Sequence, residues 1–325
     1  MAKALILGGN GFIGSHLVDA LTGAGWETVV LDRNQRRYDA LPTGVRFIQG
    51  RFNQPGLLRA ALTGVDVVFH LAWASIPASS NRNMVADVEA NLIPSLQLLE
   101  HCVAAGVRRV IFVSSGGTVY GPARQCPIPE NHPTHPINAY GVHKLTVEKY
   151  LNMFYHLHGL EYIILRPSVP YGPRQNPLGK QGAVAVFLYR IWRNLPLTLW
   201  GDGHITRDFF YISDLILALL ACTHCSMTAN PVFNIGGCEE ISLLQLIEQI
   251  EQLIGQRARL DFQPPRKFDA QHIILDTHRA KQELDWTPQI PFSQGLELTW
   301  NWMRDLYPPE ILYTESETIL DLRPA

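Results

Sequence analysis

Residues 4–21, ALILGGNGFIGSHLVDAL, decide the fold of this chain. The first four residues are apolar and predict a buried strand, a glycine-rich turn follows, and the apolar spacing of the remainder predicts a helix. Gly8, Gly11 and Gly14 form a GxxGxxG pattern, in which glycines permit a tight turn and let the backbone approach a pyrophosphate at the helix N-terminus. Strand, turn and helix in this order predict the first unit of a dinucleotide-binding fold.

A second predicted strand ends on a carboxylate. It runs from Thr28 to Leu31 and is followed by Asp32, roughly the 20 residues beyond the glycines at which an acidic residue holds ribose hydroxyls. Asp32 would repel a 2′-phosphate, which favours NAD over NADP, although Arg33 beside it would partly offset that repulsion. We therefore expect NAD as the cofactor.

Strands and helices continue to alternate along the chain. We expect strands at 45–49, 65–70, 109–114 and 160–166, and helices at 54–62, 84–105 and 139–156. This order predicts an α/β fold of Rossmann type, a doubly wound parallel sheet that binds ligands at the carboxyl ends of its strands.

Proline and glycine become frequent after residue 166, in RPSVPYGPRQNPLGKQG. We expect residues 1–166 to form the NAD-binding domain and residues 167–325 to form mainly a smaller α/β region for the substrate, from which segments can return to the first domain. Helices are predicted at 181–193, 213–223 and 242–253, and the extended stretch at 260–276. For residues 308–325 the sequence predicts no order.

Composition excludes several classes of partner. The formal net charge is −2, and 17% of the residues are charged without a basic block, so we expect no nucleic-acid partner. No apolar run is long enough to cross a membrane and the start of the chain does not resemble a signal peptide, so we expect a cytoplasmic protein. Cys222 and Cys225 form a CxxC pair, but no second pair with ligand spacing follows, and we predict no metal site.

Tyr140 and Lys144 lie four residues apart on a predicted helix, so their side chains project from one face. A free tyrosine titrates near ~10, and roughly 4 kcal/mol is needed to make it a base at neutral pH. A unit charge about 4 Å away supplies an energy of that order at an effective dielectric of roughly 20. We expect Lys144 to lower the pKa of Tyr140, although YxxxK alone also fits an ordinary amphipathic helix.

Several further motifs follow in a fixed order. They are HLA at 70–72, SSGGTVYG at 114–121, LRP at 165–167, YGPRQ at 171–175 and RDFFYISD at 207–214. Together with the glycine turn, Asp32 and the Tyr140–Lys144 pair, they make the chain resemble the extended short-chain dehydrogenase/reductase family, in particular nucleotide-sugar 4-epimerases of the UDP-glucose 4-epimerase type. The resemblance extends from about residue 3 to residue 306.

The resemblance implies a reaction and a set of site residues. Tyr140 removes the proton of the sugar 4-hydroxyl, Lys144 binds the nicotinamide ribose, and hydride moves to NAD and back through a 4-keto sugar. Trp200 would cover the nucleotide base, and Arg207 and Arg266 would grip the diphosphate. The cofactor site implied in this way comprises Gly8, Gly11, Phe12, Ile13, Gly14, Asp32, Arg33, Phe52, Leu71, Ala72, Tyr140 and Lys144. A UDP-linked sugar, a homodimer and a place in polysaccharide biosynthesis are further implications.

The sequence departs from the family pattern in the loop after the fifth strand. Gly116 stands where the family has Ser or Thr, so Thr118, Ser115 or a water must bond the reacting hydroxyl. We favour Thr118 and expect Gly116→Ser to restore part of the activity lost in Thr118→Val. Gly117 and Thr118 also occupy positions at which related dehydratases and decarboxylases carry acidic residues, which argues against elimination.

Three functions remain open at this stage. The first is an NAD-dependent 4-epimerase of a nucleotide sugar, most simply a UDP-hexose. The second is a nucleotide-sugar reductase or dehydrogenase, which would consume NAD(H) stoichiometrically. The third is a protein that binds NAD and a nucleotide sugar without converting them, a hypothesis motivated by Gly116.

Overall fold

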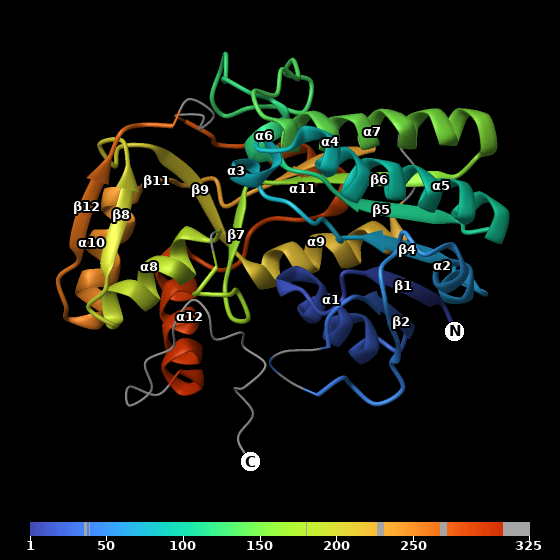
Figure 1. The fold of residues 1–325 in the computed structure, drawn as a ribbon, viewed down its shortest axis with the longest axis horizontal. Helices are drawn as coiled ribbons and strands as arrows, with labels where there is room; N and C mark the ends of the chain where they lie inside the picture. Colours follow the sequence, from blue (N-terminus) through green and yellow to red (C-terminus); the bar gives the residue numbers. More distant parts are fainter. Residues whose placement is uncertain (36–37, 39, 180, 226–230, 267–271, 308–325) are drawn as a thin grey trace.

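A seven-stranded sheet forms the centre of the molecule (Figure 1). The computed structural model describes residues 1–35, 38, 40–179, 181–225, 231–266 and 272–307. The strands are β1 (Lys3–Leu7), β2 (Glu27–Asp32), β3 (Arg46–Gln49), β4 (Val67–His70), β5 (Arg109–Val113), β6 (Glu161–Pro167) and β10 (Val232–Ile235). They lie in the order β10-β6-β5-β4-β1-β2-β3, and each pairs with its neighbours in parallel. The strand order reverses at β1: β2 and β3 follow on one side of it, and β4, β5, β6 and β10 follow on the other. The predicted doubly wound sheet is therefore confirmed.

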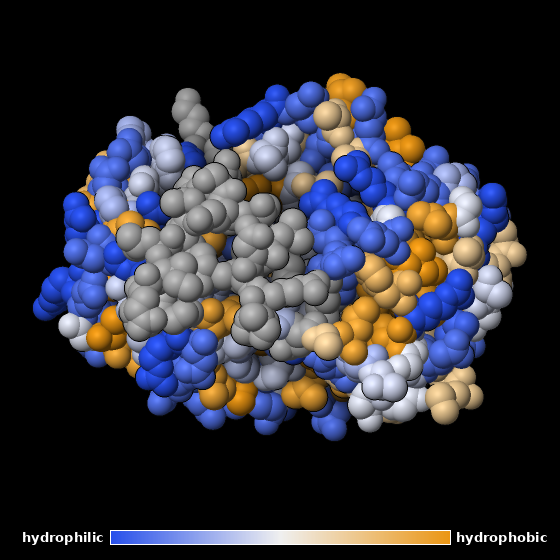
Figure 2. Space-filling view, turned by 60° about the horizontal axis from the view of Figure 1, so that its bottom comes forward, coloured by the Kyte–Doolittle hydropathy of each residue, from blue (hydrophilic) through white to orange (hydrophobic). Residues whose placement is uncertain are grey.

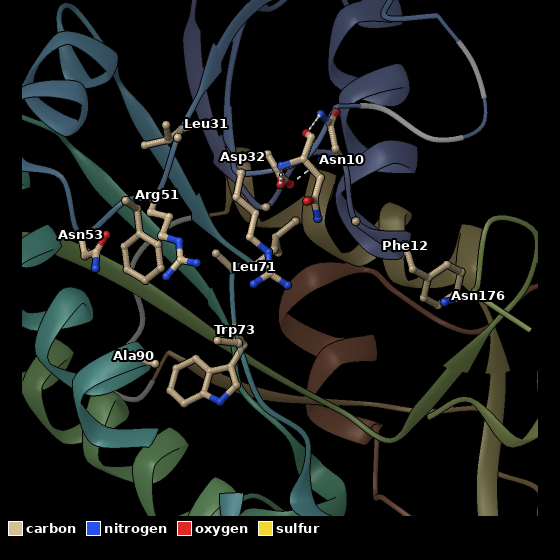
Figure 3. A pocket seen from close by; sticks show the side chains of 18 of the residues that line it. Asn10, Phe12, Leu31, Asp32, Arg51, Asn53, Leu71, Trp73, Ala90 and Asn176 are labelled. Carbon is tan, nitrogen blue, oxygen red and sulfur yellow. Dashed lines mark hydrogen bonds between the residues drawn. The ribbon is translucent and has the colours of Figure 1, made fainter. Parts of the chain in front are cut away.

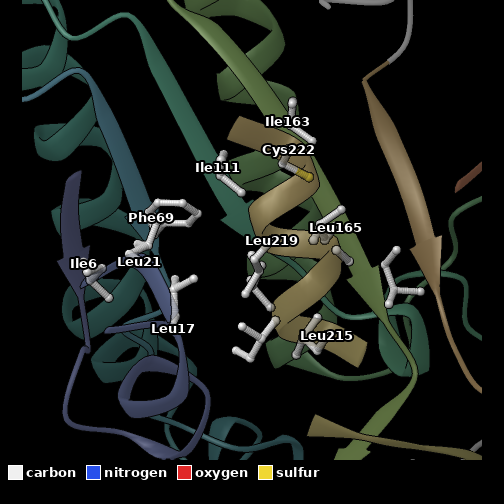
Figure 4. Packing of buried hydrophobic residues seen from close by; sticks show 14 of the residues in the cluster. Ile6, Leu17, Leu21, Phe69, Ile111, Ile163, Leu165, Leu215, Leu219 and Cys222 are labelled. Atoms are coloured by element: carbon white, nitrogen blue, oxygen red, sulfur yellow. The ribbon is translucent and has the colours of Figure 1, made fainter. Parts of the chain in front are cut away.

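Helices cover both faces of this sheet (Figure 1). One face carries α1 (Phe12–Gly23), α9 (Ile212–His224) and α11 (His278–Leu284), and the other carries α2 (Pro55–Leu62), α5 (Ile93–Ala105) and α7 (Ala139–His158). Alternate residues of β1 face the two layers, with Ile6 in the first core and Leu5 in the second. Figure 4 shows Phe69, Leu165 and Leu219 in the first core. Burial on both faces explains why the strands read as continuous apolar runs.

The C-terminal half of the chain contributes to the main sheet. Strand β10 pairs with β6, and α9 and α11 lie against the same face as α1. The remaining elements form a second region with its own core. They are β7 (Val169–Tyr171), α8 (Ala183–Trp192), β8 (Pro196–Trp200), β9 (Thr206–Tyr211), β11 (Glu240–Ser242), α10 (Leu243–Ile254), β12 (Arg259–Gln263) and α12 (Phe292–Leu306).

Two small sheets organise this second region. Strands β11, β9 and β7 form one, and β12 pairs with β8 in the other. Ser242 caps α10, as predicted, because its hydroxyl accepts a hydrogen bond from the N–H of Gln245 at 3.1 Å. The extended stretch expected at 260–276 includes β12, and its residues 267–271 lie outside the described part of the chain, as do residues 308–325.

The helix predicted at 84–105 is confirmed, with a π-helical stretch inside it. The segment consists of α4 (Met84–Asp87), a π-helical stretch Val88–Leu92, and α5. Pro94 has no N–H to donate to the preceding turn, so the regular α-helical ladder cannot run through this point. The short helices α3 (Pro77–Ser80) and α6 (Gly116–Val119) were not predicted, and both border the site described below.

Across the described residues, every helix is too short or too polar to cross a membrane. On the face shown in Figure 2, hydrophobic residues form separate groups between hydrophilic ones, as is normal where much of a folded surface is apolar. The same part of the chain contains no cluster of three His, Cys, Asp or Glu side chains that could hold a metal ion.

Candidate active site

A cavity of about 340 Å³ opens beside the glycine turn, at the carboxyl ends of β1, β2 and β4. Eight of the predicted cofactor residues line it: Gly8, Gly11, Phe12, Asp32, Arg33, Phe52, Leu71 and Ala72. The predicted set did not include the other residues that line it, which are Asn10, Leu31, Asn34, Tyr38, Gly50, Arg51, Asn53, Trp73, Ala74, Ala90, Arg174 and Asn176. Strand ends from one edge of the sheet therefore meet around a single cavity, as such folds require.

The glycine turn forms a close-packed cradle at this cavity. Gly8 has φ +82°, which favours glycine, and a Cβ there would lie 3.0 Å from the backbone nitrogen of Ala72. A Cβ on Gly14 would collide with the carbonyl oxygen of Gly8, so Gly14 allows α1 to pack on the turn rather than lining the cavity itself. Ile13 likewise does not line the cavity and packs against the first core.

Helix α1 begins at the cavity without a side-chain cap. Its N-cap residue is Gly11, which has no side chain to accept from the first N–H groups. Free N–H groups at the start of a helix bind phosphate well. The cradle and this helix start therefore fit the pyrophosphate of a dinucleotide.

Asp32 lies at one end of the cavity beside Asn10 (Figure 3). One carboxylate oxygen accepts the N–H of Asn10 at 3.0 Å, and the other accepts the N–H of Asn34 at 2.9 Å. The side-chain oxygen of Asn10 is buried without a partner. These bonds fix the carboxylate while each of its oxygens keeps acceptor capacity for ribose hydroxyls, so the residues fit NAD.

Local hydrogen bonds hold the start of α7 and hence Tyr140. Asn138 caps the helix, accepting from the N–H of Gly141 at 2.8 Å. The N–H of Tyr140 donates to the hydroxyl of Ser80 at 3.0 Å, which ties the helix to α3. Tyr140 therefore enters the site from a backbone whose terminal N–H groups are satisfied.

Lys144 is buried one turn further along. Its ammonium donates to the carbonyl oxygen of Val113 at 2.8 Å and lies 3.9 Å from the centre of the Trp73 ring and 4.7 Å from that of Phe112. The Tyr140 ring is farther away, at 5.7 Å. Burial lowers the pKa of Lys144 to about 7, and the nearby Glu148 carboxylate only partly opposes this.

The structure brings Tyr140 and Lys144 together but does not give the expected fall in the pKa of Tyr140. Burial raises the pKa of the phenol, and the Asp87 carboxylate raises it further. Asp87 is itself held by His143 at 2.6 Å and by the side chain of Asn91 at 3.1 Å. The expectation that Lys144 lowers the pKa of Tyr140 is wrong for this arrangement, because the ammonium contacts a carbonyl oxygen and two rings rather than the phenol hydroxyl.

A buried polar network next to Lys144 joins α7 to the carboxyl ends of β5 and β6. Glu148 accepts from Ser114 at 2.5 Å and from the Arg166 guanidinium at 3.1 and 2.5 Å. Arg166 also donates to the Tyr120 hydroxyl at 2.9 Å, which donates to Asn234 at 2.6 Å. Because both charges of the Glu148–Arg166 pair are buried and fully bonded, removing either partner would leave an uncompensated charge.

Gly116 is buried at the position where the family pattern has a hydroxyl residue. A Cβ there would collide with the Cδ1 atom of Leu275 and lie 3.0 Å from the carbonyl oxygen of Arg166. Leu275 thus occupies the space that a side chain at position 116 needs, so the rescue expected from Gly116→Ser requires Leu275 to move and stays a prediction. Thr118 lies in α6 and Ser115 is the N-cap residue of that helix; the Thr118 hydroxyl donates to the Ser115 carbonyl oxygen at 3.5 Å.

The predicted sugar-nucleotide residues lie in the second region. Trp200 ends β8 with 40% of its surface exposed, and the Arg266 guanidinium lies 5.3 Å from the centre of its ring. Arg207 is half-buried on β9 and donates to the carbonyl oxygen of Thr206 at 2.7 Å. Trp200 and Arg266 are therefore brought together, as an aromatic face and a cation.

Comparison with known proteins identifies the family. Residues 4–236 match the model of the NAD dependent epimerase/dehydratase family. The chain belongs to this family. A UDP-glucose 4-epimerase of Mycolicibacterium smegmatis is 33% identical over 310 residues, which cover 93% of this chain and 99% of that protein. A dTDP-4-dehydro-6-deoxyglucose reductase of Escherichia coli is 32% identical over 305 residues, which cover 90% of this chain and 95% of the relative.

Solved structures resemble this epimerase/dehydratase-family chain over nearly its whole length. A UDP-glucose 4-epimerase of Thermotoga maritima with UDP-glucose has a TM-score of 0.89 and 36% identity, covering 93% of this chain and 99% of that one. A UDP-glucuronic acid 4-epimerase of Bacillus cereus with UDP-glucuronic acid and NAD has a TM-score of 0.85 and 30% identity. The match covers 94% of this chain and 100% of that one. The predicted fold, NAD as cofactor and membership of the NAD-dependent sugar-nucleotide epimerases are thereby confirmed.

Proposed function

We propose that this protein is a UDP-hexose 4-epimerase that oxidises the sugar at C4 and returns the hydride to the opposite face. The observation that carries this proposal is the Tyr140–Lys144 pair on one face of α7, beside a cavity fitted to a dinucleotide. Bound NAD supplies a hydride acceptor that is restored in each turnover. No separate acid–base pair is needed for such a reaction, and Gly117 and Thr118 provide none.

Each residue of the site has a proposed part in this reaction. Tyr140 takes the proton of the 4-hydroxyl and returns it, while Lys144 binds the ribose and places a positive charge near the phenol. Because burial and Asp87 raise the pKa of Tyr140, the phenol is protonated at neutral pH until positive charge approaches it. Thr118, or failing it Ser115, bonds the reacting hydroxyl in place of a residue at position 116.

We propose that the second region binds the nucleotide. Trp200 offers an exposed aromatic face to the base, and Arg207 and Arg266 offer guanidinium groups to the diphosphate. A uracil nucleotide is proposed because the relatives and structural neighbours described above include UDP-sugar epimerases. The sugar itself is proposed as a hexose, with glucose and glucuronic acid as the two forms to compare first.

A panel of nucleotide sugars tests the proposal. UDP-glucose, UDP-galactose, UDP-glucuronic acid and UDP-N-acetylglucosamine would be incubated with the protein and NAD, and the products separated by chromatography. We expect interconversion of one C4-epimeric pair without net formation of NADH. A reductase or dehydrogenase, which the similarity to the E. coli reductase supports as the second candidate, would instead change the NADH concentration in step with product.

We also propose that the protein is a homodimer that pairs through α5 and α7, which lie side by side (Figure 1). Val142, Met153 and Leu157 form an apolar stripe on α7 with 44%, 39% and 65% of their surfaces exposed, and Ile93 on α5 is 44% exposed. Such a stripe suits burial against a second copy. Light scattering should give twice the chain mass and a reduced mass for Leu157→Glu; a monomeric wild-type protein would contradict the proposal.

A further inference from the structure

Trp73 separates the cavity from the catalytic pair. It lines the cavity, whereas Tyr140 and Lys144 are not among the described residues that do so. Figure 3 shows its indole at the end of the pocket away from Asp32 and Asn10. The indole meets the Tyr140 ring edge-on at 5.9 Å and covers the Lys144 ammonium at 3.9 Å. A ligand that extends from Asp32 toward the catalytic pair therefore meets the indole.

The Lys144 ammonium has three N–H donors and is surrounded by a carbonyl oxygen and two aromatic rings. One donates to the carbonyl oxygen of Val113 at 2.8 Å, and the Trp73 and Phe112 rings lie 3.9 and 4.7 Å away. Only 3% of the residue is exposed. For Lys144 to bind a ribose hydroxyl, one of these three contacts must give way.

Trp73 is the contact that can give way. The Val113 carbonyl oxygen belongs to β5, in the middle of the main sheet, and the Phe112 ring is fully buried in the second core. Trp73 lies in the loop after β4, and its indole N–H is buried with no hydrogen-bond partner. Leaving a buried donor unsatisfied is unfavourable, and no hydrogen bond holds the indole in its present orientation.

The loop backbone stays in place during such a movement. The N–H of Ala74 donates to the side chain of Asn91 at 2.7 Å, and the backbone of Ala72 packs against Gly8. Both neighbours of Trp73 are thereby fixed to the π-helical stretch and to the glycine turn. A movement of the indole would therefore use the side-chain torsions of Trp73.

We propose that Trp73 is a gate over the catalytic lysine: its indole turns away from Lys144 when the dinucleotide binds, and the released ammonium turns to the ribose and to Tyr140. This inference rests on the role proposed for Lys144 above. It predicts that part of the binding free energy of NAD is spent in breaking the contact between the ammonium and the indole face.

Affinity for NAD tests the gate, measured by calorimetry without sugar after bound dinucleotide has been removed. Trp73→Leu keeps an apolar side chain but removes the ring face, so it should bind NAD about 2- to 30-fold more tightly than wild type, which corresponds to the ~0.5–2 kcal/mol of such a contact. Trp73→Phe keeps a ring that attracts the ammonium less strongly, so its affinity for NAD should lie between those of wild type and Trp73→Leu. Trp26→Phe, at a half-buried tryptophan that does not line the cavity, is the matched control and should leave the affinity unchanged.

An affinity in Trp73→Leu equal to or weaker than that of wild type would overturn the proposal, because an indole that stacks on the cofactor predicts weaker binding. A crystal structure of the wild-type protein with NAD is the second test. It should show the indole moved from Lys144, and an indole that still covers an ammonium bonded to the ribose would overturn the gate. Since neither test involves sugar, absence of epimerisation would reject the proposed function and leave the gate to be judged on these results.

Discussion

Gly116→Ser should destabilise this protein. The substitution adds a Cβ and a hydroxyl at a buried position where the Cδ1 atom of Leu275 already lies, with the backbone carbonyl of Arg166 3.0 Å from the new Cβ. The carbonyl is part of β6 and cannot retreat, so Leu275 must leave its rotamer or α6 must shift. Overpacking of this kind costs about 1–3 kcal/mol in the free energy of unfolding.

The neighbouring glycine supplies a matched control. A Cβ on Gly117 would meet only the Ser115 hydroxyl, at 4.0 Å, so Gly117→Ser enters open space in the same short helix. Its effect on the free energy of unfolding should stay within about 0.5 kcal/mol. Urea denaturation of the two variants and wild type, followed by circular dichroism, measures the difference directly.

A double-mutant cycle identifies Leu275 as the obstacle. Leu275→Ala alone should cost about 2–5 kcal/mol, because the side chain is buried. In the Gly116→Ser background its effect should be smaller by about 1–3 kcal/mol, since the serine fills part of the space. A Gly116→Ser variant as stable as Gly117→Ser, or strictly additive effects in the cycle, would refute the steric reasoning.

Three further outcomes follow from the site. Tyr140→Phe should lower turnover by about 10²-fold or more while the dissociation constant of the nucleotide sugar stays nearly constant, and near-normal turnover would show that Tyr140 is not the base. Thr118→Val keeps the shape of the side chain and should lower kcat by the equivalent of about 1–3 kcal/mol; full activity would leave Ser115 or a water as the partner of the 4-hydroxyl. Because the pKa of Lys144 falls from its usual 10.5 to about 7, the native protein binds fewer protons than the unfolded chain between these values, and wild-type stability should rise with pH across that window. Urea denaturation at a series of pH values should show that Lys144→Met loses this rise, and an unchanged pH dependence would contradict the lowered pKa.

The sequence predicted those parts of the site that depend on local spacing. Gly8, Gly11 and Asp32 follow strand ends, and Tyr140 and Lys144 share a helix face, so their roles could be expected from periodicity and from the family resemblance. The order of alternating strands and helices likewise predicted the parallel sheet. Each of these inferences needs only residues that are close in the chain.

Contacts between distant segments could not be predicted in this way. Leu275 lies against Gly116 because its segment returns from the second region, and no sequence pattern near either residue predicts this contact. The pKa of Tyr140 is raised by burial and also by Asp87, which lies in α4. The position of Trp73, directly after HLA at a strand end, was a signal in the sequence that could have placed it in the site.

The fate of a deuterium label at C4 tests the central claim most directly. UDP-hexose deuterated at C4 would be incubated with the protein and NAD, and the C4 epimer isolated and examined by mass spectrometry and NMR. Oxidation and return of the same hydride predicts that the epimer keeps its deuterium at C4 and that no NADH accumulates. Loss of the label to solvent, or deuterium accumulating in NADH with a 4-keto product, would contradict the account.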